Sequence, residues 1–303
     1  MMSVCVAGIS NCCDLLACIP DAGENRLDIP DGTDTISSTA MRSCTGITHI
    51  TIPASVYNLF GEDFYAMTAL EYISIRENKQ HEPEKSLRRI LTFSRDGVLF
   101  SKDPAGTCTL LRYPGGRSDP VYTVPDDVRI IGDYAFSNAQ YLEHIILHEN
   151  IWEIQDYAFA YCPRLKRVEI RSRQLLCIRK SAFQFCLNLT DVDIFGVVQN
   201  IEARAFHGCR SLERITLPGS LCGLEDEAFQ SCSALKEITL LNSLPNSLPT
   251  EQQNLLPQIG LNVFYDCSAL LKIRCSECTA AQMPEYSDRI VVLPSCTGED
   301  DSR

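Results

Sequence analysis

A unit of 23 or 24 residues repeats along most of this 303-residue chain, and it constrains the fold more strongly than any other feature. Five consecutive copies place a phenylalanine at the same point of the unit: Phe136, Phe159, Phe183, Phe206 and Phe229. Two earlier copies are centred on Met41 and Phe64, and a last copy is centred on Phe264. Repetition in one register predicts a solenoid, because such a unit can bury its apolar face only against its neighbours.

The apolar period changes within each unit. With the phenylalanine numbered zero, apolar or small residues stand at −5, −1, 0 and +3, which fits about two turns of one helical face. From +6 the pattern reads Leu-x-x-Ile-x-Leu, as in Leu212, Ile215 and Leu217. Its alternation at +9 and +11 is that of a short strand with one buried face. The unit therefore predicts a short helix or turn followed by a strand, with a further apolar residue at −8 closing the turn.

The full pattern, I-x-x-x-A-F-x-x-C-x-x-L-x-x-I-x-L, resembles the BspA-like leucine-rich repeats of bacterial and protist proteins over residues 29–275. The segment Leu142-x-x-Ile145-x-Leu147-x-x-Asn150 also matches the generic leucine-rich repeat. The resemblance implies an α/β solenoid, a horseshoe with a parallel β-sheet on its concave face and short helices or turns on its convex face. It also implies cell-surface adhesion, with host matrix or neighbouring cells as partners.

The repeat pattern divides the chain into a solenoid over 27–278, an N-terminal cap or leader-like segment over 1–26, and a C-terminal cap or tail over 279–303. Residues 79–120 break the spacing and are expected to stack as an irregular β insert, similar to one often found within the family. Within it, Asp96-Gly97 between apolar runs predicts a tight hairpin. Residues 242–257 lengthen one unit and read as a polar loop punctuated by proline.

Charge and hydropathy limit the partners and the cell compartment that we expect for this chain. The net charge of −12 disfavours nucleic acid and anionic lipid, both of which require a basic surface. No apolar run is long enough to span a membrane, the N-terminus makes a poor secretory signal, and residues 293–298 lack the features of a wall anchor. The missing leader favours the cytoplasm whereas the resemblance suggests the cell surface, so the compartment stays open. We expect a monomer.

The sixteen cysteines divide by position in the unit. Six stand at +3, a core position that suits a small apolar residue, and we expect them to be buried thiols. They are Cys44, Cys162, Cys186, Cys209, Cys232 and Cys267. The terminal cysteines leave three interpretations open, namely ordinary thiols, a capping disulfide or a zinc site. They are Cys5, Cys12, Cys13 and Cys18 at one end and Cys275 and Cys278 at the other.

No motif assembles a catalytic centre. His144 and His148 are four residues apart, but they fall at +8 and +12, on or just after a strand, and read as surface residues. No phosphate loop, dinucleotide fingerprint or nucleophile elbow is present. We therefore expect neither catalysis nor a cofactor nor a bound metal.

The outward residues of the strands form columns across the sheet. The +8 column reads Arg167, Asp191, Arg214, Glu237, and such alternating charge stabilises the stack by roughly a few tenths of a kcal/mol per pair. At +10, Glu169 lies beside Asp193, a like-charge pair that should cost energy.

At +12, Phe195 is expected to be exposed and flanked by Arg171, which is the composition of a binding hot spot. The expected binding footprint consists of six residues: Ile146, His148, Glu169, Arg171, Asp193 and Phe195. The favoured function is non-enzymatic protein recognition through the concave face. A cytoplasmic interaction scaffold is the alternative, and a metal-dependent or hydrolytic enzyme built on the solenoid is a distant third.

Overall fold

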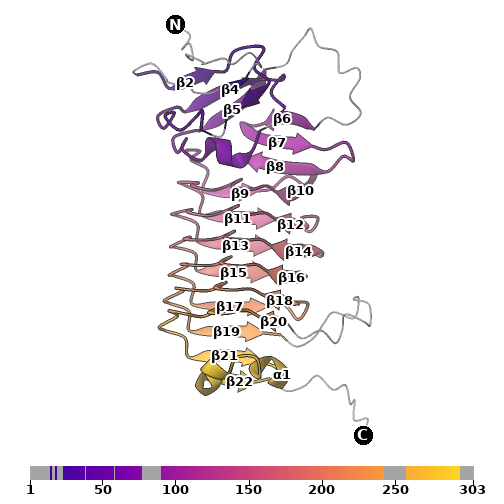
Figure 1. The fold of residues 1–303 in the computed structure, drawn as a ribbon, viewed down its shortest axis with the longest axis vertical. Helices are drawn as coiled ribbons and strands as arrows, with labels where there is room; N and C mark the ends of the chain where they lie inside the picture. The colour runs from indigo at the N-terminus through magenta and orange to yellow at the C-terminus, as the bar shows by residue number, and fades with distance from the viewer. Residues whose placement is uncertain are drawn as a thin grey trace.

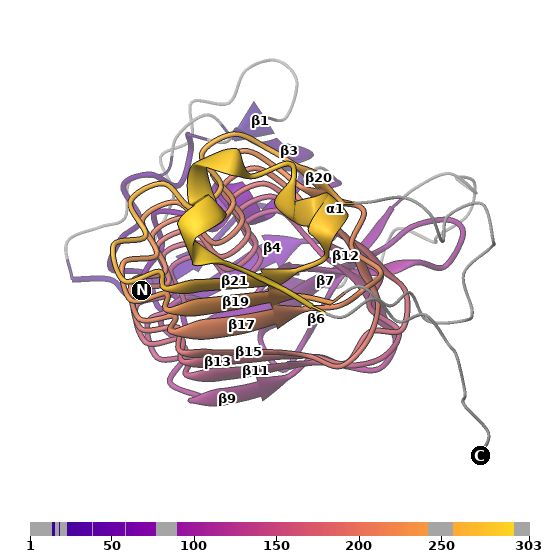
Figure 2. The same cartoon turned by 90° about the horizontal axis from the view of Figure 1, so that it is seen from below.

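The computed structural model describes residues 14–15, 18, 23–37, 39–57, 59–76, 90–241 and 257–293. The chain winds into coils that stack as a column, and each regular coil contributes two short strands and a run of turns (Figure 1). Seen along the column, the strands of successive coils lie behind one another and form two walls, with the turns as the third (Figure 2). No helix in these residues is both long and apolar enough to cross a bilayer.

The Leu-x-x-Ile-x-Leu segments form the first wall, which we call the split sheet because its ladder is interrupted once. One half contains β9 (Val121–Thr123), β11 (His144–Leu147), β13 (Arg167–Ile170) and β15 (Asp191–Ile194). The other contains β17 (Arg214–Leu217), β19 (Glu237–Leu240), β21 (Lys272–Cys275) and β22 (Ile290–Val292). All pairs within each half are parallel and in step with the repeat, so equivalent residues form columns.

The second wall is a nine-stranded sheet, here called the long sheet. Its parallel part contains β10 (Val128–Ile131), β12 (Glu153–Ile154), β14 (Leu175–Ile178), β16 (Val198–Ile201), β18 (Gly223–Leu224) and β20 (Gln258–Ile259). The described apolar residues at −5 lie on these strands, and those at −8 lie on them or just before them; both face the core, as Val198 and Ile201 show.

Of the short helices or turns expected opposite the sheet, the regular coils contain turns and no helix. Between the long sheet and the next split-sheet strand, each regular coil runs through turns with positive φ at −2 and +2, such as Tyr157 (56°) and Tyr161 (60°). Left-handed residues at these points cannot continue a right-handed helix. The backbone bonds instead to the next coil, as when the Phe159 N–H donates to the Ala182 oxygen at 2.7 Å. The −5 residue therefore belongs to a strand, and its helical spacing from the phenylalanine is coincidental.

The core is a continuous stack of the repeat phenylalanines, all fully buried from Phe136 to Phe229. Consecutive rings lie 4.8–5.1 Å apart and within 13° of parallel along this run. The described +3 cysteines are buried and pack beside the rings, as expected. From Cys162 to Cys267 they also donate hydrogen bonds to the phenylalanine carbonyl of the preceding coil, for example Cys186 Sγ to the Phe159 oxygen at 3.0 Å. This bond gives cysteine an advantage over alanine at +3.

The N-terminal coils stack in the same way. They contain β1 (Asp14–Leu15), which pairs with β3 (Thr35–Ile36), and β2 (Arg26–Asp28), β4 (His49–Pro53) and β5 (Tyr72–Arg76), which form a three-stranded sheet. A short 3-10 helix, η1 (Gly61–Phe64), lies between β4 and β5 in the sequence.

The irregular insert joins these coils to the rest of the column. It contributes β6 (Leu91–Arg95), β7 (Val98–Lys102) and β8 (Cys108–Arg112) as an antiparallel meander that extends the long sheet. Asp96 and Gly97 form the expected tight hairpin, with φ of 50° and 78°.

The C-terminal end carries α1 (Glu277–Ala280) and η2 (Pro284–Arg289), which precede β22. Met283 is fully buried, and Tyr286 packs edge-on against Phe264 at 5.6 Å, so these residues cover the last core ring. Several sequence predictions lie outside the described residues, including Cys5, Cys12 and Cys13, the side chain of Cys278, the loop 242–257 apart from its last residue, and nearly all of 293–298.

Candidate functional site

The predicted footprint lies on one stretch of the split sheet. Ile146, Glu169 and Asp193 are direct cross-strand neighbours on β11, β13 and β15. Arg171 and Phe195 follow the ends of β13 and β15. Phe195 is 67% exposed, as its position at +12 predicts. The glycine after it is required, because a Cβ on Gly196 would meet the Ser172 oxygen at 1.6 Å.

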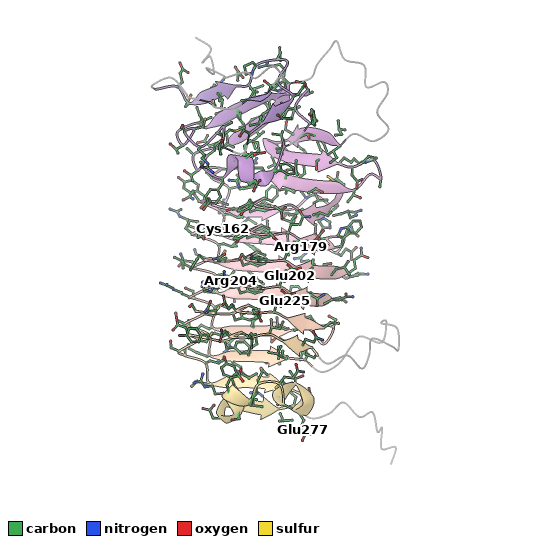
Figure 3. The ribbon with its side chains drawn as sticks, viewed as in Figure 1. Cys162, Arg179, Glu202, Arg204, Glu225 and Glu277 are labelled. Carbon is green, nitrogen blue, oxygen red and sulfur yellow. The ribbon has the colours of Figure 1, made fainter. Side chains whose placement is uncertain are left out.

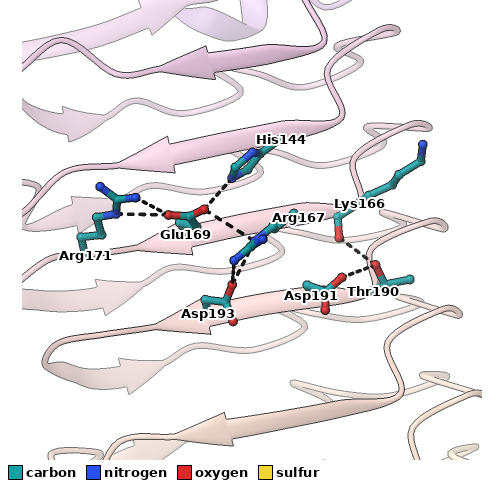
Figure 4. A network of polar contacts seen from close by, with 8 residues as sticks. All are labelled: His144, Lys166, Arg167, Glu169, Arg171, Thr190, Asp191 and Asp193. Carbon is teal, nitrogen blue, oxygen red and sulfur yellow. Dashed lines mark hydrogen bonds and ion pairs between the residues drawn. The ribbon is translucent and has the colours of Figure 1, made fainter.

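Glu169 is the centre of a polar network on this face (Figure 4). Its side chain is nearly buried, and its two carboxylate oxygens contact three cationic or ionisable groups. Arg171 Nη2 lies 2.6 Å from Oε2, while His144 Nε2 lies 3.0 Å and Arg167 Nε 3.6 Å from Oε1. The Arg171 hydrogen bonds, followed by the charge of that guanidinium, hold the pKa of Glu169 below its ordinary value. Glu169 is therefore a charged anchor of the sheet surface.

Arg167 contacts both Glu169 and Asp193 and so compensates the repulsion expected between them, which corrects the sequence interpretation. Arg167 reaches diagonally across the sheet and donates from Nε at 3.0 Å and from Nη2 at 2.7 Å to Asp193 Oδ2, while Nε also lies within ion-pair distance of Glu169 (Figure 4). Diagonal neighbours are within reach of a side chain of this length. The pairing of Arg167 with Asp191 that the +8 column predicted is also wrong. Asp191 accepts a hydrogen bond from Thr190 Oγ1 at 2.7 Å, and Arg167 bonds to Asp193.

His148 differs from the expectation of a free surface side chain. It is half-buried, its Nε2 lies 2.9 Å from the Pro125 oxygen, and its Nδ1 accepts the Asn150 N–H at 3.1 Å. This pair of bonds requires the neutral tautomer protonated at Nε2. Burial lowers the pKa of the ring accordingly. Both ring nitrogens of His148 are therefore occupied by bonds within the chain, and the side chain contributes to the surface by its position.

Phe195 stands between two hollows. One has a volume of about 700 Å³ and is lined by Asp126, His148, Glu149, Arg171, Arg173 and Phe195. The other, of about 900 Å³, lies where β15 faces β17 and includes Asp191, Asp193 and Arg214 in its walls. An exposed aromatic ring flanked by hollows and by charged side chains is a surface suited to binding a protein.

Sequence reasoning missed a second pocket, which we call the tyrosine pocket. It has a volume of about 390 Å³ and is lined by Arg42, Glu62, Asp63, Tyr65, Ala66, Tyr134, Tyr157 and Tyr161. Tyr134 and Tyr157 stack at 4.9 Å, and Tyr65 meets Tyr134 edge-on at 6.0 Å. Burial raises the pKa of Asp63 to about 6. The only available signal was the recurrence of tyrosine at −2 in two successive units, with a further tyrosine at +2 in the second.

Other acidic side chains accept hydrogen bonds that join neighbouring coils. On the long-sheet side, Glu202 accepts the Lys180 N–H at 3.1 Å and the Cys177 thiol at 3.0 Å, and Glu225 accepts the Ala203 N–H at 3.1 Å (Figure 3). In the part of the chain that the structure describes, no three His, Cys, Asp or Glu side chains gather as metal ligands. The described cysteines from Cys108 to Cys275 form no disulfide.

Comparison with known proteins identifies the repeat. The family model for the BspA type leucine-rich repeat region matches six copies over residues 23–90, 121–236 and 177–287. A leucine-rich cell surface protein from Faecalibacterium prausnitzii is similar in structure, with a TM-score of 0.59 and 26% identity, covering 77% of this chain and 62% of that one.

The pneumococcal vaccine antigen PcpA gives a TM-score of 0.60 at 20% identity, covering 89% of this chain and 68% of its own. A leucine-rich repeat protein from Eubacterium ventriosum gives 0.52 at 20% identity, covering 80% and 64%. At these identities the last two show the fold alone. This chain spans less than two thirds of the Faecalibacterium and Eubacterium proteins. No protein of curated function matches it.

Proposed function

The chain belongs to the BspA-type leucine-rich repeat family, and from this premise we propose that it is a non-enzymatic recognition protein whose split-sheet face around Phe195 binds a protein partner. The observation that carries the proposal is the exposed Phe195 ring between two hollows, beside the Glu169 network. Truncating such a central aromatic or arginine commonly costs a complex more than about 1 kcal/mol, whereas most surrounding contacts are nearly neutral.

The proposed role is adhesion at a cell surface. The similar Faecalibacterium protein is described as a cell surface protein, which supports this compartment. Acidic charge and an exposed aromatic ring fit a protein partner better than nucleic acid or anionic lipid. Matrix proteins or proteins of neighbouring cells are the partners that such a role implies.

Binding can be tested with the purified chain and an extracellular-matrix protein extract immobilised in wells. The double variant Phe195→Ala, Arg171→Ala should bind about tenfold or more weakly at an unchanged melting temperature. Tyr265→Ala is the matched control, because Tyr265 is also a strongly exposed aromatic residue but lies on the turns of a distant coil. Equal affinity of the double variant and the wild type for the extract would contradict a binding site around Phe195.

An intracellular interaction scaffold is the second candidate, and one observation favours it. The nine described cysteines from Cys108 to Cys275 form no disulfide, which is the state that a reducing compartment maintains. Protease treatment of intact source cells, followed by blotting for this chain, separates the two. Loss of the protein supports adhesion, and full protection supports the scaffold.

A further inference from the structure

The tyrosine pocket lies on the wall of turns, on elements other than those of the split-sheet face. Its lining comes from a turn of the N-terminal coils, from η1 with the residues that follow it, and from turns of the first regular coils. The pocket therefore joins the two parts of the column, and the proposed recognition of a protein partner makes no use of it.

The two sides of the pocket are fixed to one another. Arg112 is fully buried and donates from Nη1 to the Tyr134 oxygen at 2.7 Å and from Nη2 to the Phe64 oxygen at 3.4 Å. Gly61 brings η1 so close to the column that a Cβ there would meet the Asp133 oxygen at 2.1 Å. The pocket is therefore formed before a ligand arrives, which lowers the entropy cost of binding.

Tyrosines make up half of the lining. Tyr134 and Tyr157 stack within 5° of parallel, while Tyr65 stands at 83° to Tyr134, so the aromatic lining turns through a right angle. Tyr65 and Tyr161 remain 42% and 38% exposed, which leaves ring surface accessible to a ligand. Several aromatic rings set at different angles around one pocket form the kind of cage that attracts organic cations.

Two carboxylates give the pocket a negative field. Asp63 lines the pocket at only 4% exposure, and the charge of the adjoining Glu62 adds to the effect of burial on its pKa. Burial is the main cause that raises the pKa of Tyr134 to about 12, and the Glu62 carboxylate contributes. Neither carboxylate takes part in an ion pair among the residues that the structure describes. A bound cation therefore meets unpaired negative charge.

Two arginines lie nearby, and neither is paired with these carboxylates. Arg112 is outside the lining, and its guanidinium is bound to two main-chain oxygens. Arg42 belongs to the lining but is exposed. Its positive charge opposes a cationic ligand and would attract an anionic one, so its removal reports the sign of the charge that the ligand carries.

We propose that the tyrosine pocket binds a small organic cation through an alkylated ammonium group. The alkyl groups of such an ion share its positive charge and make favourable contacts with aromatic rings and with phenol oxygens. The volume of about 390 Å³ accommodates a trimethylammonium group with a short tail. The net charge of −12 also favours the approach of a cation to the protein.

Isothermal titration calorimetry of the full chain with choline tests the proposal. The uncharged carbon isostere of choline, 3,3-dimethylbutan-1-ol, has nearly the same shape, so the difference between the two affinities reports the effect of charge. We expect saturable binding of choline, about tenfold or more tighter than that of the alcohol. The absence of saturable binding, or equal affinity for the two compounds, would overturn the inference.

Substitutions of exposed residues locate the site without disturbing the core. Tyr65→Leu removes one ring and should weaken choline binding about tenfold, whereas Tyr141→Leu, which changes an equally exposed tyrosine outside the pocket, should leave it unchanged. Glu62→Gln should weaken binding about threefold, and Arg42→Gln should strengthen it. All four variants should melt near the wild-type temperature. Weaker binding by Arg42→Gln would overturn the assignment of a cationic ligand.

Alkylated ammonium groups occur both on free solutes and on lipid headgroups. Co-sedimentation with phosphatidylcholine vesicles that free choline competes away would assign the pocket to a headgroup, and the absence of co-sedimentation would assign it to a free ion. The outcome is independent of the proposed function, because the double variant of Phe195 and Arg171 should bind choline as the wild type does.

Discussion

Asp63 provides the sharpest quantitative test of the packing between the N-terminal coils and the rest of the column. It lies on η1, only 4% exposed, and its Oδ2 accepts the Phe60 N–H at 2.9 Å. Burial raises its pKa from 3.8 to about 6, and that one hydrogen bond offsets only part of the desolvation. The folded protein therefore binds the Asp63 proton more tightly than the unfolded chain does.

The sign of the pH effect follows from this difference. Between about pH 4 and 6 the native state holds more protons at this site than the unfolded state, so the Asp63 contribution to stability falls as pH rises. At about 1.36 kcal/mol per pKa unit, a rise from 3.8 to about 6 destabilises the folded protein by about 3 kcal/mol above the folded pKa. Asp63→Asn keeps an oxygen for the Phe60 N–H and removes the titration.

Denaturant unfolding of both proteins across this pH range measures the effect. We expect equal stability near pH ~4, an advantage for Asp63→Asn of about 1.5 kcal/mol at pH ~5, and an advantage of about 3 kcal/mol at pH ~7.5. The comparison cancels the other carboxylates. A difference independent of pH, or an asparagine variant less stable at neutral pH, would refute the reasoning.

Three further predictions concern the column and its surface. Phe183→Ala removes a fully buried ring stacked at 4.9 and 5.1 Å on its neighbours and should cost about 3–5 kcal/mol in denaturant unfolding, whereas Phe195→Ala should change stability by less than about 0.5 kcal/mol. Similar losses would contradict the assignment of core and surface. Glu169→Gln should lower the free energy of unfolding by about 1–2 kcal/mol at neutral pH, more than the exposed Glu143→Gln does. Because Arg171 lowers the pKa of Glu169, the difference between the two variants should shrink on acidification. A loss that persists in acid would count against the network. Burial raises the pKa of Cys209 to about 12, so its thiol should resist iodoacetamide until the chain unfolds, and labelling of the native protein detected by mass spectrometry would disprove its burial.

The strand half of each unit could be predicted from the sequence because alternation at +9 and +11 has one reading, a strand with one buried face. The segment of each unit from −5 to +3 could not be predicted. An apolar spacing of −5, −1, 0 and +3 suits a helix, but it also suits a coil that places −5 on one strand and the phenylalanine on a turn. The positive φ values that decide the matter fall on Tyr157, Tyr161 and Arg204, residue types that carry no left-handed signal.

The candidate site was predictable to a similar degree. Position in the repeat predicted the exposure of Phe195, because its +12 position follows the end of a split-sheet strand. Column order could not predict the Glu169 network, since Arg167 bonds diagonally to Asp193. The tyrosine pocket joins η1 to turns about 70 residues later, and such a contact leaves no local pattern.

The most direct test of recognition by this face is amide hydrogen exchange, followed peptide by peptide, with and without bound protein from the matrix extract. The proposed function predicts slower exchange on β13 and β15 and in the residues that follow them, with the long sheet and the tyrosine pocket unchanged. Protection confined to the long sheet or to the tyrosine pocket would contradict it and move the site to another wall of the column.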